Sequence, residues 1–289
     1  MTDKETDAVT GTETTGHEWD GIKELNTPLP RWWLWTFYIT IVWALGYVIA
    51  YPALPFASGA PRGALGYSSR EAVHDRIAEA REAQAGLYAK IDSLSLAEIR
   101  ADADAYQFAV NGGRAAFAVN CSQCHGSGAQ GSPGYPNLND DVWLWGGSLE
   151  AIHTTLQHGV RYAQDDDTRF SEMPAFGRDG LLNHAQVVAT SQFVSKLGGL
   201  DHDPALAAKG APIFEENCAA CHKSDGVGDR EQGAPNLTDA IWLYGDTIDD
   251  IARQVSLPRH GVMPGWKDRL DPATLKQLAV FVHSLGGGE

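Results

Sequence analysis

The sequence contains one short motif twice, and this motif restricts the fold more than any other feature. In each copy two cysteines flank two residues and histidine follows directly: Cys121-Ser122-Gln123-Cys124-His125 and Cys218-Ala219-Ala220-Cys221-His222. Cys-x-x-Cys-His is the attachment site of c-type haem. The two thiols form thioethers with the porphyrin, and the histidine binds the iron as an axial ligand. The sequence therefore predicts two covalently bound haem c groups.

A thioredoxin-like redox pair is the alternative interpretation of each Cys-x-x-Cys. That chemistry gives no reason for a histidine after the second cysteine in both copies. The chain has four cysteines in all, so haem attachment leaves none for disulfides. We expect an electron carrier first, and a catalyst only if one iron lacks a sixth ligand.

The methionines provide candidates for that sixth ligand. Besides Met1 the chain has only Met173 and Met263, each downstream of one motif and each followed by proline. A single methionine is usually core filler, but here the count matches the number of haems. A histidine–methionine pair is typical of an electron-transfer haem, because the thioether raises the reduction potential. Six-coordinate irons would leave no position for oxygen or peroxide.

The two motifs belong to a longer internal repeat. Cys121 and Cys218 are 97 positions apart, and several landmarks recur near that offset. They are Gly113-x-x-x-Phe117 and Gly210-x-x-x-Phe214, Pro136-Asn137-Leu138 and Pro235-Asn236-Leu237, Trp143-Leu144 and Trp242-Leu243, and His158-Gly159-Val160 and His260-Gly261-Val262. The repeat predicts a mainly α fold with two tandem class I cytochrome c-type domains, at 105–200 and 201–289, each of three or four helices around one haem.

Within each domain, the helix before the cysteines and the last helix are expected to carry phenylalanines on their apolar faces. These are Phe117 and Phe193 in the first copy, and Phe214 and Phe281 in the second.

The remaining landmarks have expected roles around the haem. The carbonyls of Pro136 and Pro235 are predicted to accept the Nδ1 hydrogen of each motif histidine, with ordinary turn chemistry as the alternative. Trp143 and Trp242 fit either contact with a porphyrin or propionate, or plain core packing. His158 and His260 are interpreted as loop or surface histidines.

The copies differ at one place. Met173 lies fifteen positions after His158, whereas Met263 lies three positions after His260. The inserted segment 161–170 is polar and acidic and is expected to form a surface loop. We favour tolerated loop variation over a docking role for it.

An apolar segment precedes both repeats. Residues 32–51 contain no charge, and as a helix they would span roughly 30 Å, the thickness of the hydrocarbon core. Tryptophans gather at one end and tyrosines at the other, as in interfacial belts. A cleaved signal peptide would need a basic start and a shorter core, whereas residues 1–30 hold seven acidic side chains against two lysines. We predict a permanent single transmembrane helix.

Orientation follows from haem chemistry, because neither flank is strongly basic. Haem c is attached outside the cytoplasm, so we expect a bacterial inner-membrane protein with periplasmic haem domains and a cytoplasmic tail, residues 1–31. Residues 52–104 are expected to be a helical periplasmic linker with a capping box at Ser68-x-x-Glu71. Its apolar stripe is predicted to face a partner: Val73, Ile77, Ala80, Leu87 and Ile91.

The segment from His17 to Trp33, HEWDGIKELNTPLPRWW, resembles the N-terminal signature of the dihaem subunits of cbb3-type haem–copper oxidases, the CcoP or FixP family. Tyr51-Pro52 and the two haem motifs extend the resemblance over essentially the whole chain. It implies Cys121, Cys124, His125 and Met173 at the first haem, and Cys218, Cys221, His222 and Met263 at the second.

The resemblance also implies a role and partners. The chain would be a non-catalytic electron-transfer subunit of a proton-translocating cytochrome c oxidase in aerobic or microaerobic respiration. Electrons would come from a periplasmic or membrane-anchored cytochrome c, itself reduced by the quinol–cytochrome c reductase. They would pass to the monohaem cytochrome c subunit and then to the haem b and copper of the catalytic subunit, where oxygen becomes water. A small subunit would complete the complex.

Charge is consistent with a docking step. The net charge is −15, which gives no reason to expect a nucleic-acid partner and could steer a basic cytochrome c; solubility alone is an equally good explanation. Residues 201–289 carry 8 basic against 14 acidic side chains, compared with 5 against 8 in 105–200. We therefore expect the second domain to receive the electron.

Two other functions stay open. A free-standing membrane-anchored dihaem carrier would need the same haem units but not the N-terminal signature. A dihaem peroxidase would need an iron without its sixth ligand.

Overall fold

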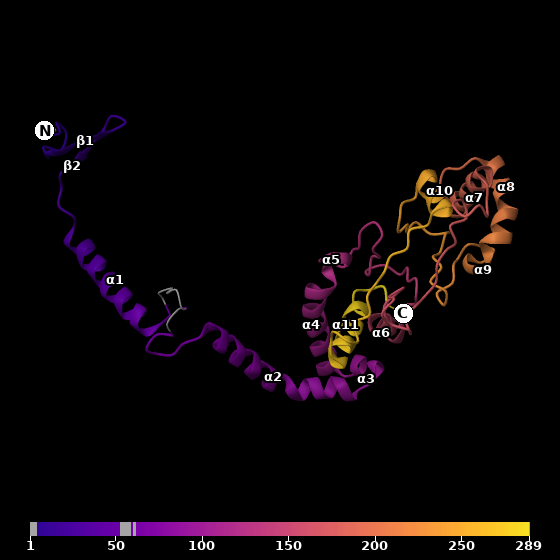
Figure 1. The fold of residues 1–289 in the computed structure, drawn as a ribbon, viewed down its shortest axis with the longest axis horizontal. Helices are drawn as coiled ribbons and strands as arrows, with labels where there is room; N and C mark the ends of the chain where they lie inside the picture. Colours follow the sequence, from indigo (N-terminus) through magenta and orange to yellow (C-terminus); the bar gives the residue numbers. More distant parts are fainter. Residues whose placement is uncertain (1–4, 53–58, 60–61, 289) are drawn as a thin grey trace. The chain divides into compact units, whose positions relative to one another are not determined.

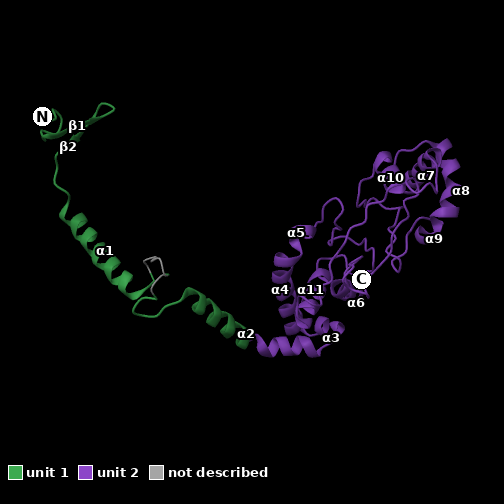
Figure 2. Ribbon diagram, viewed as in Figure 1, with its two compact units in different colours: residues 1–83 green, residues 84–289 purple. Residues whose placement is uncertain are grey.

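The computed structural model describes residues 5–52, 59 and 62–288. These residues form two compact units, 1–83 and 84–289, which Figure 2 colours separately.

The first unit begins with a β-hairpin that the sequence analysis treated only as a tail. Strand β1 (Thr14–Trp19) pairs antiparallel with β2 (Ile22–Leu25). Asp20 and Gly21 join them with φ of 49° and 84°. Two positive φ values define the two-residue turn that suits strand twist, and Asp-Gly is its usual sequence. That dipeptide was the signal for this hairpin.

Helix α1 (Arg31–Ala50) is the predicted apolar segment, displaced by one residue. Its mean hydropathy reaches 1.6, and it is long and apolar enough to cross a membrane. No α1 residue is buried, so its apolar surface is left for another environment. The helix ends at Tyr51, which is extended (φ −117°, ψ 160°) because the following residue is Pro52.

Helix α2 (Ser69–Ser93) fills much of the expected linker. Ser68 Oγ accepts from the backbone N–H of Glu71 at 3.3 Å, so the predicted cap is present on the serine side. The predicted partner-facing stripe is only partly correct. Val73 and Ile77 are exposed, but Ile91 is fully buried in the core of the second unit. The linker thus ends before residue 104, because the last turns of α2 pack into the second unit.

The regular secondary structure of the second unit is helical, apart from isolated β-bridges, among its described residues. Polar side chains cap its longer helices by accepting from backbone N–H groups, as Asp, Asn, Ser and Thr prefer. The helices are α3 (Leu96–Ala101), α4 (Ala103–Asn120), α5 (Ser122–His125), α6 (Leu149–His158), α7 (His184–Leu197), α8 (Pro204–Asn217), α9 (Ala219–His222), α10 (Ile248–Ser256) and α11 (Pro272–His283).

The long helices pair across the two repeats. Helix α11 packs on α4, and α7 packs on α8; Figure 1 shows yellow α11 beside magenta α4, with α7 and α8 together at the other end of the unit. Phe117 lies 5.4 Å from Phe281 and Phe193 lies 5.2 Å from Phe214, between ring centroids. The expectation that each repeat closes on its own last helix was therefore wrong.

Chain connectivity explains this exchange. Only residues 198–203 separate α7 from α8, and helices joined by a short connection tend to pack as antiparallel neighbours. Once α7 and α8 pair, α4 is left for α11. Residues 84–289 consequently form one compact unit, although 105–200 and 201–289 remain the two repeats in sequence.

Two glycines allow the helices to cross closely. A Cβ at Gly113 of α4 would overlap the carbonyl oxygen of Gln277 in α11, and one at Gly210 of α8 would overlap the carbonyl oxygen of Ala189 in α7. Both glycines lie one turn before the phenylalanine of the same helix. The repeated Gly-x-x-x-Phe pattern is therefore a helix-crossing pattern, and its two copies build two separate crossings.

We predict that Gly113→Ala and Gly210→Ala each lower the stability of the second unit. The added methyl must force backbone apart, and overpacking of this kind costs about 1–3 kcal/mol. Gly86→Ala in α2 is the matched control, because nothing lies within 4 Å of its Cβ position; it should be neutral or stabilising by up to about 1 kcal/mol. Urea unfolding followed by circular dichroism measures the difference. Equal midpoints for all three variants would contradict the close crossings.

Candidate haem sites

Each Cys-x-x-Cys-His motif forms one short helix directly after a long one. Cys121 ends α4 and begins α5, and Cys218 does the same between α8 and α9. In both motifs the first cysteine is buried and the second is exposed. Burial, with a smaller contribution from the neighbouring thiol, raises the pKa of Cys121 and of Cys218 to about 11. The two thiols of a motif thus lie on one helical turn, with the first cysteine buried and the second exposed.

Both motif histidines are oriented by the predicted hydrogen bond. His125 Nδ1–H donates to the carbonyl of Pro136 at 3.0 Å, and His222 Nδ1–H donates to that of Pro235 at 3.0 Å. Burial lowers the pKa of both imidazoles, although these hydrogen bonds oppose the shift. A neutral imidazole with Nδ1 engaged has Nε2 free to bind a metal.

A cavity of about 220 Å³, partly open to solvent, lies beside the first motif. Cys121, Cys124 and His125 line it, together with Met263. Most of its other lining side chains are apolar or aromatic, among them Leu138, Val142, Trp143, Leu156 and Val282. Two thiols, an oriented imidazole and a thioether around an apolar cavity fit a covalently attached haem.

Each methionine lies beside the motif of the other repeat, whereas the resemblance implied that it lies beside the motif of its own repeat. Met263 lines the cavity of the first motif, and its backbone pairs with Val160 through hydrogen bonds of 2.9 and 3.0 Å. Met173 packs instead against the core that contains Phe214 and Cys218 of the second motif. The exchange follows from the helix pairing. Met263 precedes α11, which packs on α4 before the first motif, and Met173 precedes α7, which packs on α8 before the second motif.

The two motif regions also touch each other. A Cβ at Gly233 would overlap the Trp145 ring, and one at Gly134 would lie 3.3 Å from the Tyr244 ring. Trp145 and Tyr244 both line the first cavity. The residue before Gly233 is Gln232, whose Oε1 lies 3.5 Å from Cys221 Sγ. Trp145 therefore connects the first cavity with the loop beside the second motif.

Sequence reasoning missed Trp145 and Tyr244. The offset of 99 that relates Pro136 to Pro235 also relates Trp145 to Tyr244 and Gly134 to Gly233. That second alignment of aromatic and glycine positions was the available signal.

Arg161 was also missed. Its guanidinium lines the first cavity and donates to the carbonyls of Gly261 (2.7 Å) and Ser171 (2.9 Å). Burial lowers its pKa. No repeat partner marks this position, because it opens the inserted segment.

The remaining tryptophans and histidines singled out from the sequence differ in their surroundings. Trp143 lines the first cavity, and its Nε1–H donates to the carbonyl of Gly287. The Nε1–H of Trp242 is buried and has no partner within the described part of the chain. His260 is exposed, as expected. His158 is half-buried and bonded to Asp165 at 3.1 Å, so its interpretation as a loop or surface histidine was wrong.

Three family models match the chain. Residues 11–58 match the N-terminal domain of cytochrome oxidase-cbb3, FixP; residues 205–282 match cytochrome c oxidase, cbb3-type, subunit III; and residues 110–198 match cytochrome c.

Curated relatives match nearly the full length. The chain is 54% identical to a cbb3-type cytochrome c oxidase subunit CcoP from Cereibacter sphaeroides, over 96% of this chain and 95% of the relative. It is 54% identical to a FixP subunit from Rhizobium meliloti (99% and 98% covered). It is 50% identical to one from Bradyrhizobium diazoefficiens, with both chains covered completely.

We predict that Gly233→Ala destabilises the second unit more than Gly180→Ala does. Both glycines have a left-handed φ, +61° and +72°, so both alanines carry a strain of about 1–2 kcal/mol. Only Gly233 meets another side chain, Trp145, whereas Gly180 has open space. The excess loss should be about 1–3 kcal/mol, measured by urea unfolding. Equal losses would show that Trp145 does not pack on this loop.

Proposed function

Since the chain belongs to the CcoP/FixP family of cbb3-type cytochrome c oxidase subunits, we propose that it holds two covalent haem c groups that carry electrons in series through this subunit. The observation that carries the proposal is the meeting of Cys121, Cys124, His125 and Met263 around one apolar cavity. Haem c, when bound, supplies a reversible one-electron couple.

The proposed ligand sets follow the exchanged pairing. Cys121, Cys124, His125 and Met263 would hold the first haem; Cys218, Cys221, His222 and Met173 would hold the second. The carbonyls of Pro136 and Pro235 fix the axial imidazoles and raise their basicity. A histidine–methionine pair suits electron transfer and fills both axial positions. This argues against the peroxidase alternative.

Membrane placement and partners complete the proposal. Helix α1 would be the single span, with the N-terminal hairpin in the cytoplasm and residues 84–289 in the periplasm of a bacterial inner membrane. The donor would be a soluble or membrane-anchored cytochrome c reduced by the quinol–cytochrome c reductase. The acceptors would be the monohaem and catalytic subunits of the same oxidase, alongside its small subunit. Purification of the intact complex from native membranes separates this role from that of a free-standing carrier.

The pairing can be tested in chains with one covalent haem. In a Cys218→Ala/Cys221→Ala background, Met263→His should lower the potential of the remaining haem, because imidazole favours ferric iron more than a thioether does. A fall of about 0.1 V corresponds to roughly fifty-fold in the one-electron equilibrium at ~59 mV per decade. Met173→His should leave that potential unchanged. Redox titration followed by visible absorption measures both.

The reciprocal background, Cys121→Ala/Cys124→Ala, should reverse the result, with Met173→His alone lowering the potential. If a one-haem chain does not accumulate, the same two methionine variants are titrated in the intact chain, where each should displace one of two waves. Two covalent haems in either cysteine background would show that the attachment sites are elsewhere. A response of the first haem to Met173→His would restore pairing within each repeat.

Removal of residues 1–55 behind a cleavable signal peptide should give a soluble periplasmic protein that keeps both haems. No α1 residue is buried, so the second unit loses no core contact when α1 is removed. Haem staining of soluble and membrane fractions measures the distribution, with the full chain as the control. A truncated chain that still sediments with membranes would mean that another segment anchors it.

A further inference from the structure

The inserted segment 161–170 folds back against the end of α6 instead of extending into solvent. Val160, just before it, forms a parallel bridge with Arg169 at its far end. Val160 also forms the antiparallel bridge with Met263. The insertion therefore closes a loop directly beside the strand-like segment that carries Met263.

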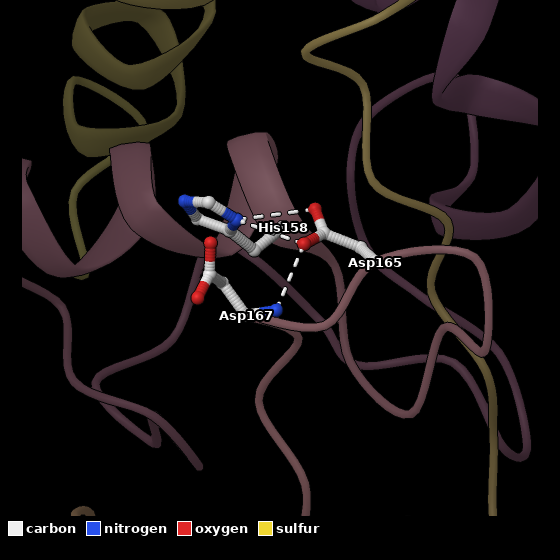
Figure 3. Close-up of side chains that lie close together, drawn as sticks. All are labelled: His158, Asp165 and Asp167. Atoms are coloured by element: carbon white, nitrogen blue, oxygen red, sulfur yellow. Dashed lines mark hydrogen bonds and ion pairs between the residues drawn. The ribbon is translucent and has the colours of Figure 1, made fainter.

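A buried carboxylate stands at the centre of this loop. The Asp165 side chain is 4% exposed. Its oxygens accept from Lys267 Nζ at 2.9 Å, from His158 Nδ1 at 3.1 Å and from the backbone N–H of Asp167 at 2.9 Å. Figure 3 shows His158 and Asp167 converging on Asp165.

His158, Asp165 and Asp167 have the composition of a metal site, and their ligand atoms lie within 4.8 Å of one another. The ammonium of Lys267 already bonds Asp165 Oδ2 and lies 3.4 Å from His158 Nδ1. The hydrogen bond between the two side chains lowers the pKa of Asp165 and raises the pKa of Lys267, so both groups are charged. A positive charge thus occupies the cluster without a metal.

Lys267 belongs to the same segment as Met263. Along that segment Arg161 donates to the Gly261 carbonyl, Val160 pairs with Met263, and the Trp266 N–H donates to the Leu156 carbonyl at 2.9 Å. The Asp165–Lys267 ion pair comes next and joins segment 158–169 to segment 260–267 through side chains. Every anchor of Met263 named here comes from residues 156–165 of the other repeat.

The difference between the repeats gives a reason for this arrangement. Only two residues separate His260 from Met263, too few to fold back and support the methionine from its own side. Support must come from another segment. The longer connection in the first repeat supplies it, and this accounts for an insertion that the sequence analysis favoured as tolerated variation.

We propose that Asp165 and Lys267, with His158, form a positioning latch that holds Met263 at the first haem site. Asp165 and Lys267 are positioning residues, since neither lines the first cavity and they act through the segment that carries Met263. The inference rests on the proposed function, in which Met263 is the axial ligand of the first haem.

The test compares Asp165→Asn and Lys267→Gln with Asp166→Asn in the full-length dihaem protein. Asparagine keeps the shape of Asp165 but removes its charge; Asp166 is exposed and forms none of the contacts described above. The readouts are covalent haem content, the two reduction potentials, the near-infrared band of methionine-bound ferric haem, and the affinity of the ferric protein for added imidazole, which competes with a loosened methionine.

Loss of the latch should raise the imidazole affinity of the first haem about tenfold, equivalent to ~1.4 kcal/mol of coupling. It should weaken that haem's methionine band and lower its potential, while the second haem stays unchanged. Asp166→Asn should match the parent protein. Asp165→Asn/Lys267→Gln should be no worse than the single variants, because both remove one interaction. Lys267→Arg keeps the charge and should retain parental values, which tests the latch even if Asp165→Asn folds poorly.

Three results would overturn the proposal. The first is a lower unfolding midpoint for Asp165→Asn with both potentials and imidazole affinities unchanged, which would leave the pair a merely structural role. The second is an equal effect on the second haem. The third is a response of the first-haem potential to added Ca²⁺ that Asp165→Asn abolishes, which would make the cluster a cation site. If Met263→His leaves the first haem unchanged, the ligand assignment fails instead.

Discussion

The crossing of α4 with α11, and of α7 with α8, is the contact on which the rest of the second unit depends. Each crossing brings a glycine of one helix against a backbone carbonyl of the other, so the helices approach more closely than any side chain would allow. The pairing of these helices also determines where the segments that precede them in the chain lie. The segment before α11 reaches the first motif with Met263, and the segment before α7 reaches the second motif with Met173. Residues from both repeats therefore surround each motif.

This exchange changes how the unit should be regarded as an electron carrier. Two independent domains joined by a linker would vary in separation and orientation. Here the helix exchange and the contacts of Trp145 with Gly233 and Tyr244 with Gly134 fasten one motif region to the other. In the function proposed above, a fixed arrangement suits electron transfer between the two haems, because no domain motion is needed to bring them together. It also means that damage to one core disturbs both sites.

The polar groups around the sites have separate tasks. Proline carbonyls orient the motif histidines, whose burial keeps them neutral. The latch of Asp165 and Lys267 is charged, and its cost of desolvation is offset by the hydrogen bonds from His158 and Asp167 to the same carboxylate. Desolvation can cancel the Coulombic gain of such a pair, so we assign it a role in the geometry of the segment that carries Met263 and not in overall stability.

The sequence alone determined the parts of this protein whose chemistry is local. Five consecutive residues define each proposed haem attachment site, twenty apolar residues define α1, and the proline carbonyls lie only 11 and 13 positions along the chain from their histidines. The sequence could not decide which methionine lies beside which motif, since both repeats carry the same landmarks and either pairing is consistent with them. It also gave no sign that Ile91 is core, or that the acidic insertion holds a buried carboxylate. The tertiary structure decided these points through contacts between distant residues: the short connection pairs α7 with α8, leaves α11 for α4, and so carries each methionine to the other repeat's motif.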